Sequence, residues 1–197
     1  MARDRASRPE ARPLRLFVAV DVPDEVRTLI GDALAPLRER YPRARWVPLQ
    51  NQHVTLKFLG RTWPRLLDLV RRRVGSVAGR SAPFAARVEG MGAFPSARRA
   101  RVLWAGLDDP AGAMASLAAG LDEALASEFE PERRAFTPHL TVARFDPPVA
   151  VEEVPELASA PFEVDRLVLY RSRLQRPAPV YEVLEAFPLG GGGPAGV

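Results

Sequence analysis

The feature that most constrains the fold of this chain is an internal repeat of strand, helix and histidine-bearing strand. The chain has only two histidines, and each begins the same four-residue pattern, His-x-Thr-x with an apolar x, at residues 53–56 and 139–142. Phe17 precedes His53 by 36 positions, and Trp104 precedes His139 by 35. Two similar half-chains predict two lobes related by a pseudo-two-fold axis, because a solenoid needs three or more repeats.

Apolar periodicity predicts the same order of elements in each half. A short apolar run is typical of a buried strand, and apolar residues at i, i+3, i+4 and i+7 indicate a helix. The segment "SAPF" begins a further strand in each half. The expected elements are strands at 14–20 and 101–107, helices at 23–40 and from Asp109-Pro110 to about residue 127, strands after residues 81 and 159, and helices at 64–77 and 151–158.

The repeat predicts one bilobal α+β domain over residues 14–189. Residues 1–13 lack apolar periodicity and are expected to be a disordered tail, and the glycine-rich residues 190–197 are expected to be a flexible tail. The axis would bring equivalent residues together. We therefore expect His53 and His139 to face each other across a central cleft.

Composition narrows the class of protein and its partners. The chain has no cysteine, which excludes disulfides and thiolate chemistry and fits a reducing compartment. Its apolar runs are far shorter than the roughly 20 residues of a membrane span, so we expect a cytoplasmic protein without a membrane partner. The net charge of +4 favours an anionic partner. Nearly all of the positive charge comes from arginine, a bias that is equally consistent with genomic composition.

The two tetrapeptides carry the candidate chemistry. Residues two apart on a strand share a face, so His53, Thr55 and Lys57 should project together, and so should His139 and Thr141. Imidazoles titrate near neutrality and can act as general acid and general base, while threonine hydroxyls can donate hydrogen bonds to phosphoryl oxygens. The residues thus predict a site for a tetrahedral phosphate, and this scheme needs no metal.

Two other interpretations of the tetrapeptides remain open at this level. Polar residues can lie on strands without any chemical role, and threonine is common there. A zinc site would need a third ligand, such as a carboxylate, at a position that the sequence does not indicate. The repetition at equivalent places and the lack of any other histidine favour the phosphate site over both.

The sequence resembles the 2H phosphoesterase superfamily, and most closely its bacterial and archaeal RNA 2′,3′-cyclic phosphodiesterase branch, also called 2′-5′ RNA ligase-like. The resemblance covers residues 14–189 and rests on the segments "RLFVAVDVP", "RWVPLQNQHVTLKFLG", "GAFPSARRARVLWAG", "FTPHLTVARF" and "FEVDRLVLYRSRL". It implies a bilobal fold in which two antiparallel sheets, flanked by helices, surround a central cleft. It also implies hydrolysis of RNA 2′,3′-cyclic phosphate ends to 2′-phosphates without a cofactor, and 2′-5′ ligation as the reverse reaction.

The resemblance also assigns roles to individual residues. It implies His53 as proton donor and His139 as proton acceptor, an order that the residues alone leave open. It implies a phosphate contact for Arg144, five residues after His139, although an odd offset turns a side chain away from the histidine face unless the strand bulges. Phe58 holds the matching place after His53 and is either a base contact or a core residue. Lys57 is either a substrate contact or an accident of composition.

The expected partner is RNA with a 2′,3′-cyclic phosphate end, including fragments of transfer RNA, and the expected state is a monomer. Two arginine groups could contact its backbone or simply face solvent; they are Arg98, Arg99 and Arg101, and Arg133 with Arg134. An enzyme for small cyclic nucleotides and an RNA-binding module without chemistry are the alternative functions.

Overall fold

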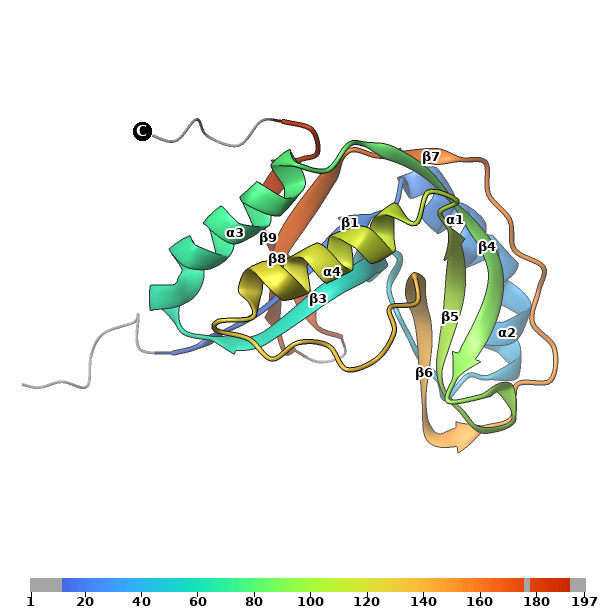
Figure 1. Ribbon diagram of the computed structural model, residues 1–197. Helices are drawn as coiled ribbons and strands as arrows, with labels where there is room; N and C mark the ends of the chain where they lie inside the picture. Colours follow the sequence, from blue (N-terminus) through green and yellow to red (C-terminus); the bar gives the residue numbers. More distant parts are fainter. Residues whose placement is uncertain (1–11, 176–177, 192–197) are drawn as a thin grey trace, which may run out of the picture.

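The computed structural model describes residues 12–175 and 178–191 (Figure 1). Most of the two predicted tails, residues 1–11 and 192–197, therefore lies outside the described residues. The elements are β1 (Leu14–Asp21), α1 (Asp24–Ala33), α2 (Ala35–Arg40), β2 (Arg45–Trp46), the 3-10 turn η2 (Leu49–Asn51), β3 (His53–Thr62), η3 (Pro64–Leu66), α3 (Leu67–Gly79), β4 (Phe84–Phe94), η4 (Ala97–Arg99), β5 (Ala100–Asp108), α4 (Ala113–Leu125), β6 (His139–Val149), β7 (Phe162–Val164), β8 (Arg166–Arg173) and β9 (Val180–Pro188).

The strands form one curled antiparallel sheet with the order β7-β4-β5-β6-β3-β1-β8-β9, and β2 adds to the edge of β6. In each half the strand that precedes the helix pairs with the histidine strand, β1 with β3 and β5 with β6. This is the repeat that the sequence predicts. The α+β class is confirmed.

The two halves of the sheet meet at a single residue pair. β3 and β6 are paired only through Val54 and Leu140, each the residue that follows a histidine. On one side of this pair lie β6, β5, β4 and β7, and on the other lie β3, β1, β8 and β9. The two predicted antiparallel sheets are thus two halves of one sheet, and the pseudo-two-fold axis passes through the Val54–Leu140 pair.

Helices cover one side of the curled sheet. α3 and α4 pack side by side, with α4 against β3 and α3 against β8 and β9 (Figure 1). Figure 1 shows α1 and α2 beside the other half, along β4 to β6, although both helices follow β1 in the chain. Their buried residues, including Ile30 and Leu34, join those of both halves in one core. The halves are therefore interlaced.

Two predicted helices differ in the structure. The helix predicted at 23–40 is two helices that meet at Leu34, because Pro36 in the first turn of α2 has no N–H with which to continue the α1 hydrogen bonding. The segment 151–158 is not helical. Pro155 interrupts it, and it is instead an irregular connection whose Val151 and Leu157 enter the core. Within the described residues, no helix combines the length and apolar character that crossing a membrane requires.

Candidate active site

The alternation of β1 defines two faces of the sheet. Leu16, Val18 and Val20 belong to the main core, whereas Phe17 and Ala19 belong to a smaller cluster on the opposite face. Ala19 lies opposite Thr55, and Asp21 lies opposite His53. Because directly opposed residues share a face, His53 and Thr55 project on the side of Phe17. We call this side of the sheet the histidine face.

The Val54–Leu140 pair brings the second motif to the same place. Both side chains are fully buried in the main core, so the residues that flank each of them on its strand project to the histidine face. His53 and Thr55 come from β3, and His139 and Thr141 come from β6. All four are partly exposed. The structure thus groups two imidazoles and two hydroxyls around one point at the centre of the sheet.

Each histidine strand contains a β-bulge at the last residue of its His-x-Thr-x tetrapeptide. On β3 the register steps from Thr55 to Lys57 as β1 advances by one residue, which leaves Leu56 as the extra residue. On β6 the corresponding step passes over Val142. Both extra residues point into the core, as does the residue after each. A bulge reverses the parity of the strand, so the fifth residue after each histidine returns to the histidine face.

This reversal decides the positions of Phe58 and Arg144. Phe58 lies opposite Phe17, its ring centroid is 6.0 Å from that of Phe17, and it is 61% exposed. Arg144 is exposed at the equivalent place on β6. In a regular strand, the offset of five residues would turn Arg144 away from the face of His139. The bulge at Val142 reverses the alternation and returns Arg144 to that face. Phe58 is an aromatic group at the edge of the site and not a core residue.

The prediction that Lys57 shares the face of His53 is wrong. Lys57 lies opposite Val18 and is only 5% exposed. Its ammonium group forms an ion pair with Asp122 on α4 and donates a hydrogen bond of 2.7 Å to the carbonyl of Glu130. The bulge at Leu56 turns Lys57 toward the core and away from the histidine face.

The ring of His53 is enclosed by aromatic side chains of neighbouring strands. Phe17 stacks on it at a centroid distance of 4.7 Å, Tyr170 stacks at 5.8 Å, and Tyr181 lies nearly perpendicular to it at a centroid distance of 5.1 Å. The pKa of His53 is lowered to about 4, chiefly by burial and in smaller part by the charge of Arg27, against an opposing hydrogen bond with the backbone of Asn51. His53 is therefore a neutral imidazole at pH 7 in the unliganded protein.

A polar network lies beside this aromatic group. The hydroxyl of Tyr170 is 2.8 Å from both carboxylate oxygens of Asp21, to which it donates, and Arg27 lies 3.8 Å from the same carboxylate. Burial and Asp21 together raise the pKa of Tyr170. The hydrogen bond to Asp21 fixes the tyrosine ring in the stack with Phe17 and His53.

His139 is held in a comparable but less enclosed way. Its Nδ1 is 2.8 Å from the carbonyl oxygen of Thr137, which precedes it by two residues, as Asn51 precedes His53. A carbonyl can only accept, so Nδ1 carries the hydrogen, and in a neutral ring Nε2 is the free acceptor. The rings of Phe94 and Trp104 lie in T-shaped arrangements with that of His139, at centroid distances of 5.2 and 6.3 Å.

Arg144 connects the two halves of the site electrostatically. Burial raises the pKa of Tyr181, and the positive charges of Arg144 and Arg15 oppose this rise. Tyr181 itself contacts His53. The charge of Arg144, on the half that carries His139, thus acts on a tyrosine of the half that carries His53. Arg45 on β2 lies directly opposite Arg144 and shares its face.

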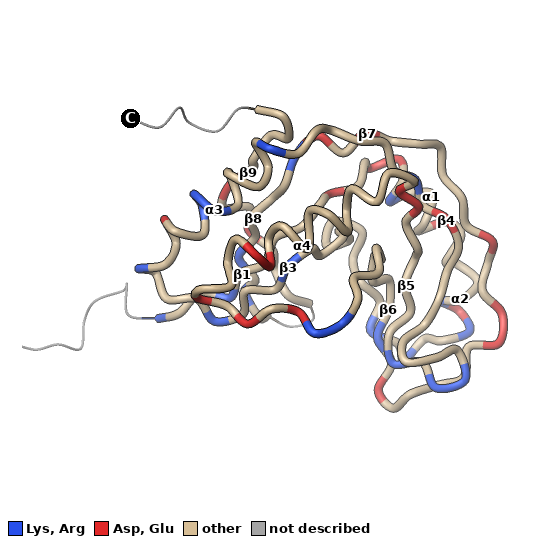
Figure 2. Tube along the Cα trace, viewed as in Figure 1, with Lys and Arg blue, Asp and Glu red and all other residues tan. Residues whose placement is uncertain are grey.

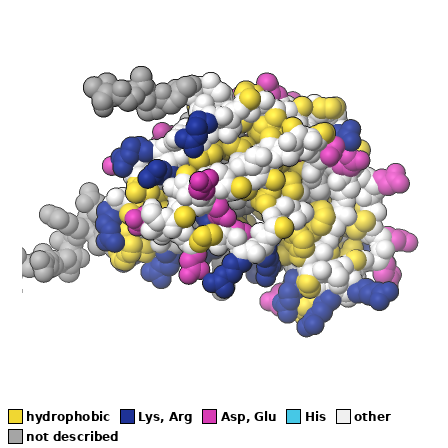
Figure 3. All heavy atoms as spheres, viewed as in Figure 1, with side chains coloured by type: hydrophobic (Ala, Val, Ile, Leu, Met, Phe, Trp, Pro, Cys, Tyr) yellow, Lys and Arg dark blue, Asp and Glu magenta, His cyan; other side chains and the backbone are white. Residues whose placement is uncertain are grey.

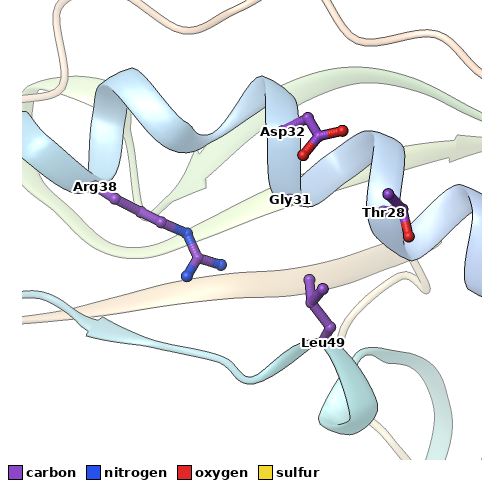
Figure 4. Close-up of a pocket in the computed structure, with 5 residues that line it drawn as sticks. All are labelled: Thr28, Gly31, Asp32, Arg38 and Leu49. Atoms are coloured by element: carbon purple, nitrogen blue, oxygen red, sulfur yellow. The ribbon is translucent and has the colours of Figure 1, made fainter.

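The site lies on the side of the sheet opposite to the helices, because the helices pack on the main core and the histidines project to the other face. Figure 3 shows the face over which α3 and α4 lie, and no histidine is visible on it. A pocket of about 250 Å³ opens elsewhere, between α1, α2 and η2, and is lined by Asp32, Arg38 and Leu49 among others (Figure 4). No predicted site residue lines that pocket. Across residues 12–175 and 178–191, no three His, Cys, Asp or Glu side chains are grouped as a metal ion would require.

Several residues around the histidines are not predicted by the sequence. Phe17, Tyr170, Tyr181 and Phe94 carry no signal of a role at the site, and Trp104 reads as a packing residue. They come from five different strands, β1, β8, β9, β4 and β5, which only the curl of the sheet brings together. All except Tyr181 lie in segments that carry the family resemblance, but nothing in their spacing indicates contact with a histidine.

A curled sheet with two His-x-Thr-x strands at its centre defines a protein of the two-histidine phosphoesterase class. The profile of the 2′-5′ RNA ligase superfamily matches residues 22–176, and the chain belongs to this family. An RNA 2′,3′-cyclic phosphodiesterase of Thermus thermophilus is 36% identical over 190 residues, which cover 90% of this chain and 91% of the relative.

Two further comparisons agree. An RNA 2′,3′-cyclic phosphodiesterase of Geobacillus stearothermophilus is 34% identical over 181 residues, which cover 88% of this chain and 56% of that relative, so the chain spans little more than half of its length. A crystal structure of a Thermus thermophilus protein superposes with a TM-score of 0.80 at 32% identity and covers 90% of this chain and 99% of that one.

Proposed function

We propose that this protein hydrolyses the 2′,3′-cyclic phosphate at the 3′ end of RNA to a 2′-phosphate. The observation that carries the proposal is the convergence of both His-x-Thr-x strands on the Val54–Leu140 pair, with the polar residues of both on one face. Membership of the 2′-5′ RNA ligase family, and relatives named RNA 2′,3′-cyclic phosphodiesterase, support RNA as the substrate.

The two histidines divide the proton transfers. His139 takes a proton from water, whose oxygen attacks phosphorus, and the bond from phosphorus to the 3′ oxygen breaks while His53 gives a proton to that oxygen. The free Nε2 of His139 supports its role as acceptor. His53 is neutral in the unliganded protein, so its role as donor requires a raised pKa in the complex, which the negative charge of the bound phosphodiester provides.

The remaining residues hold the phosphate and the terminal base. Thr55 and Thr141 donate hydrogen bonds to the phosphoryl oxygens, and Arg144 balances the charge that grows on them in the transition state. Phe58, exposed on the histidine face, stacks on the terminal base. With the 5′ hydroxyl of a second RNA in place of water as the nucleophile, the same steps form a 2′-5′ linkage and release the 3′ hydroxyl. Both histidines come from one chain, so a monomer suffices.

A substrate with sulfur in place of the 3′ oxygen tests the division of roles. A thiolate leaves without a proton, so the cyclic phosphate with 3′ sulfur no longer needs a general acid. His53→Ala should lose at least about 10³-fold in kcat/KM on the ordinary substrate and recover most of that loss on the sulfur substrate. His139→Ala should lose activity on both. Rescue of His139→Ala instead would reverse the assignment, and near-normal turnover by either variant on the ordinary substrate would exclude the mechanism.

Two controls define the reaction class. Conversion of a cyclic-phosphate oligoribonucleotide by the pure protein should persist in EDTA, and loss of activity that a divalent metal restores would contradict the metal-free scheme. Comparison of an oligoribonucleotide, a transfer-RNA fragment and a 2′,3′-cyclic mononucleotide then separates an RNA-end enzyme from one for small cyclic nucleotides. A protein that binds RNA with the same affinity after both histidines are changed, and that converts none of these substrates, would be a binding module only.

A further inference from the structure

The histidine face continues beyond the site along β1 and β3, where it carries two arginines opposite each other. Arg15 and Arg61 are directly paired across the two strands, and both are exposed. The alternation of β1 places Arg15 on the face of Phe17, and Arg61 shares that face because it is its direct partner. A second irregularity at Leu59, followed by Gly60 with φ of 62°, a value that glycine adopts readily, brings Arg61 into this register.

This arginine pair has no counter-charge in the part of the chain that the structure describes. Neither side chain forms an ion pair there. The next strands, β8 and β9, present four residues on the same face that are uncharged near neutral pH: Tyr170, Ser172, Tyr181 and Val183. Like charges placed directly opposite each other on a sheet destabilise it. A cost of this kind is relieved when an anion binds between the two guanidinium groups.

The arginine pair belongs to the surroundings of the histidine site. The charge of Arg15, like that of Arg144, opposes the rise in the pKa of Tyr181, and the ring of Tyr181 contacts His53. Arg15 is six residues from Asp21, the partner of His53, which corresponds to about 20 Å along the strand. Phe58 lies between the two places on the same face. Figure 2 shows basic residues gathered around the ends of β1, β3, β5 and β6.

We propose that Arg15 and Arg61 bind a backbone phosphodiester of the RNA upstream of its terminal nucleotide. This inference rests on the proposed function, and it specifies the substrate class as an oligoribonucleotide. The order of groups along the face matches that of the substrate from its 3′ end: cyclic phosphate at the histidines, terminal base at Phe58, and preceding phosphates at the arginine pair. A mononucleotide lacks the last of these.

A binding experiment tests the inference without turnover. Fluorescence anisotropy measures the affinity of the full chain for a labelled octaribonucleotide that ends in a 2′-phosphate, the reaction product. Arg15→Gln/Arg61→Gln should bind about tenfold more weakly, and the slope of log K against log salt concentration should become shallower by about 0.7 for each phosphate that is no longer bound. The matched control, Arg72→Gln/Arg73→Gln, removes two charges from α3, on the other side of the sheet. Equal effects of the two double variants would overturn the inference.

A kinetic experiment gives the substrate class. The ratio of kcat/KM for a cyclic-phosphate octamer to that for a 2′,3′-cyclic mononucleotide should fall about tenfold in Arg15→Gln/Arg61→Gln and remain at the wild-type value in the α3 control. An unchanged ratio would contradict the inference. If the wild-type protein converts no cyclic phosphate while the arginine variant alone loses affinity for the octamer, the proposed function fails and the backbone contact stands.

Discussion

At the scale of single residues, His53 and His139 share a motif but have different surroundings. Three aromatic rings enclose His53, whereas two lie near His139, and each histidine has a hydrogen bond with the backbone of the residue two positions before it. An imidazole in an apolar enclosure loses its proton easily and regains it when an anion arrives. The difference in enclosure therefore links protonation of His53 to substrate binding.

The lowered pKa of His53 predicts how stability depends on pH. The unfolded chain binds a proton on His53 near pH 6.5, and the folded protein does so only near pH 4, so the free energy of unfolding should decrease as the pH falls through this window. The difference between the plateaus above and below this window amounts to about 3 kcal/mol. Urea unfolding of the wild type and of His53→Gln at pH 7.5, 5.5 and 4.5 should show most of this decrease in the wild type only. Parallel pH dependences of the two proteins would refute this interpretation.

At the scale of elements, the decisive feature is the bulge in each histidine strand. Sequence periodicity predicts the strands, the histidine face and most of the helices, because hydrophobic alternation encodes them. It cannot predict a bulge, since one extra residue leaves composition unchanged and reverses the parity of everything that follows. For this reason the pattern places the histidines and threonines of both motifs correctly and puts Lys57 on the wrong face. The aromatic enclosure depends on contacts between distant strands, which local periodicity does not encode.

Lys57 joins three elements, and its replacement should destabilise the protein without affecting catalysis directly. It connects β3 to Asp122 on α4 and to the segment before β6, where the same carboxylate also accepts a hydrogen bond of 2.9 Å from the amide of Glu132. Lys57→Met leaves Asp122 unpaired and should lower the free energy of unfolding by about 2–4 kcal/mol. Lys57→Met/Asp122→Leu should recover part of this loss in urea denaturation. Equal stability of Lys57→Met and the exposed control Arg72→Gln would contradict the structural role.

At the scale of the whole molecule, the halves of the sheet touch through one residue pair, and the helices hold them together. α1 and α2 follow β1 but lie along the other half, and β8 and β9 return from the second half of the chain to pair beside β1. Neither half is a contiguous piece of the chain. The position of the two imidazoles relative to each other therefore depends on the common core and not on either half alone.

The paired bulges place two different residues, Phe58 and Arg144, at equivalent points of the site. The pseudo-two-fold axis exchanges His53 with His139 and Phe58 with Arg144, but it does not repeat the aromatic rings around His53 or the Arg15–Arg61 pair. Phe58→Arg/Arg144→Phe should therefore leave the direction of the RNA unchanged. The double exchange should lose at least as much kcat/KM as either single variant, and the 3′-sulfur substrate should still rescue loss of His53. Rescue of His139→Ala in the exchanged background would contradict this expectation. The histidines supply the proton transfers, and the groups that the axis does not repeat decide which histidine performs which.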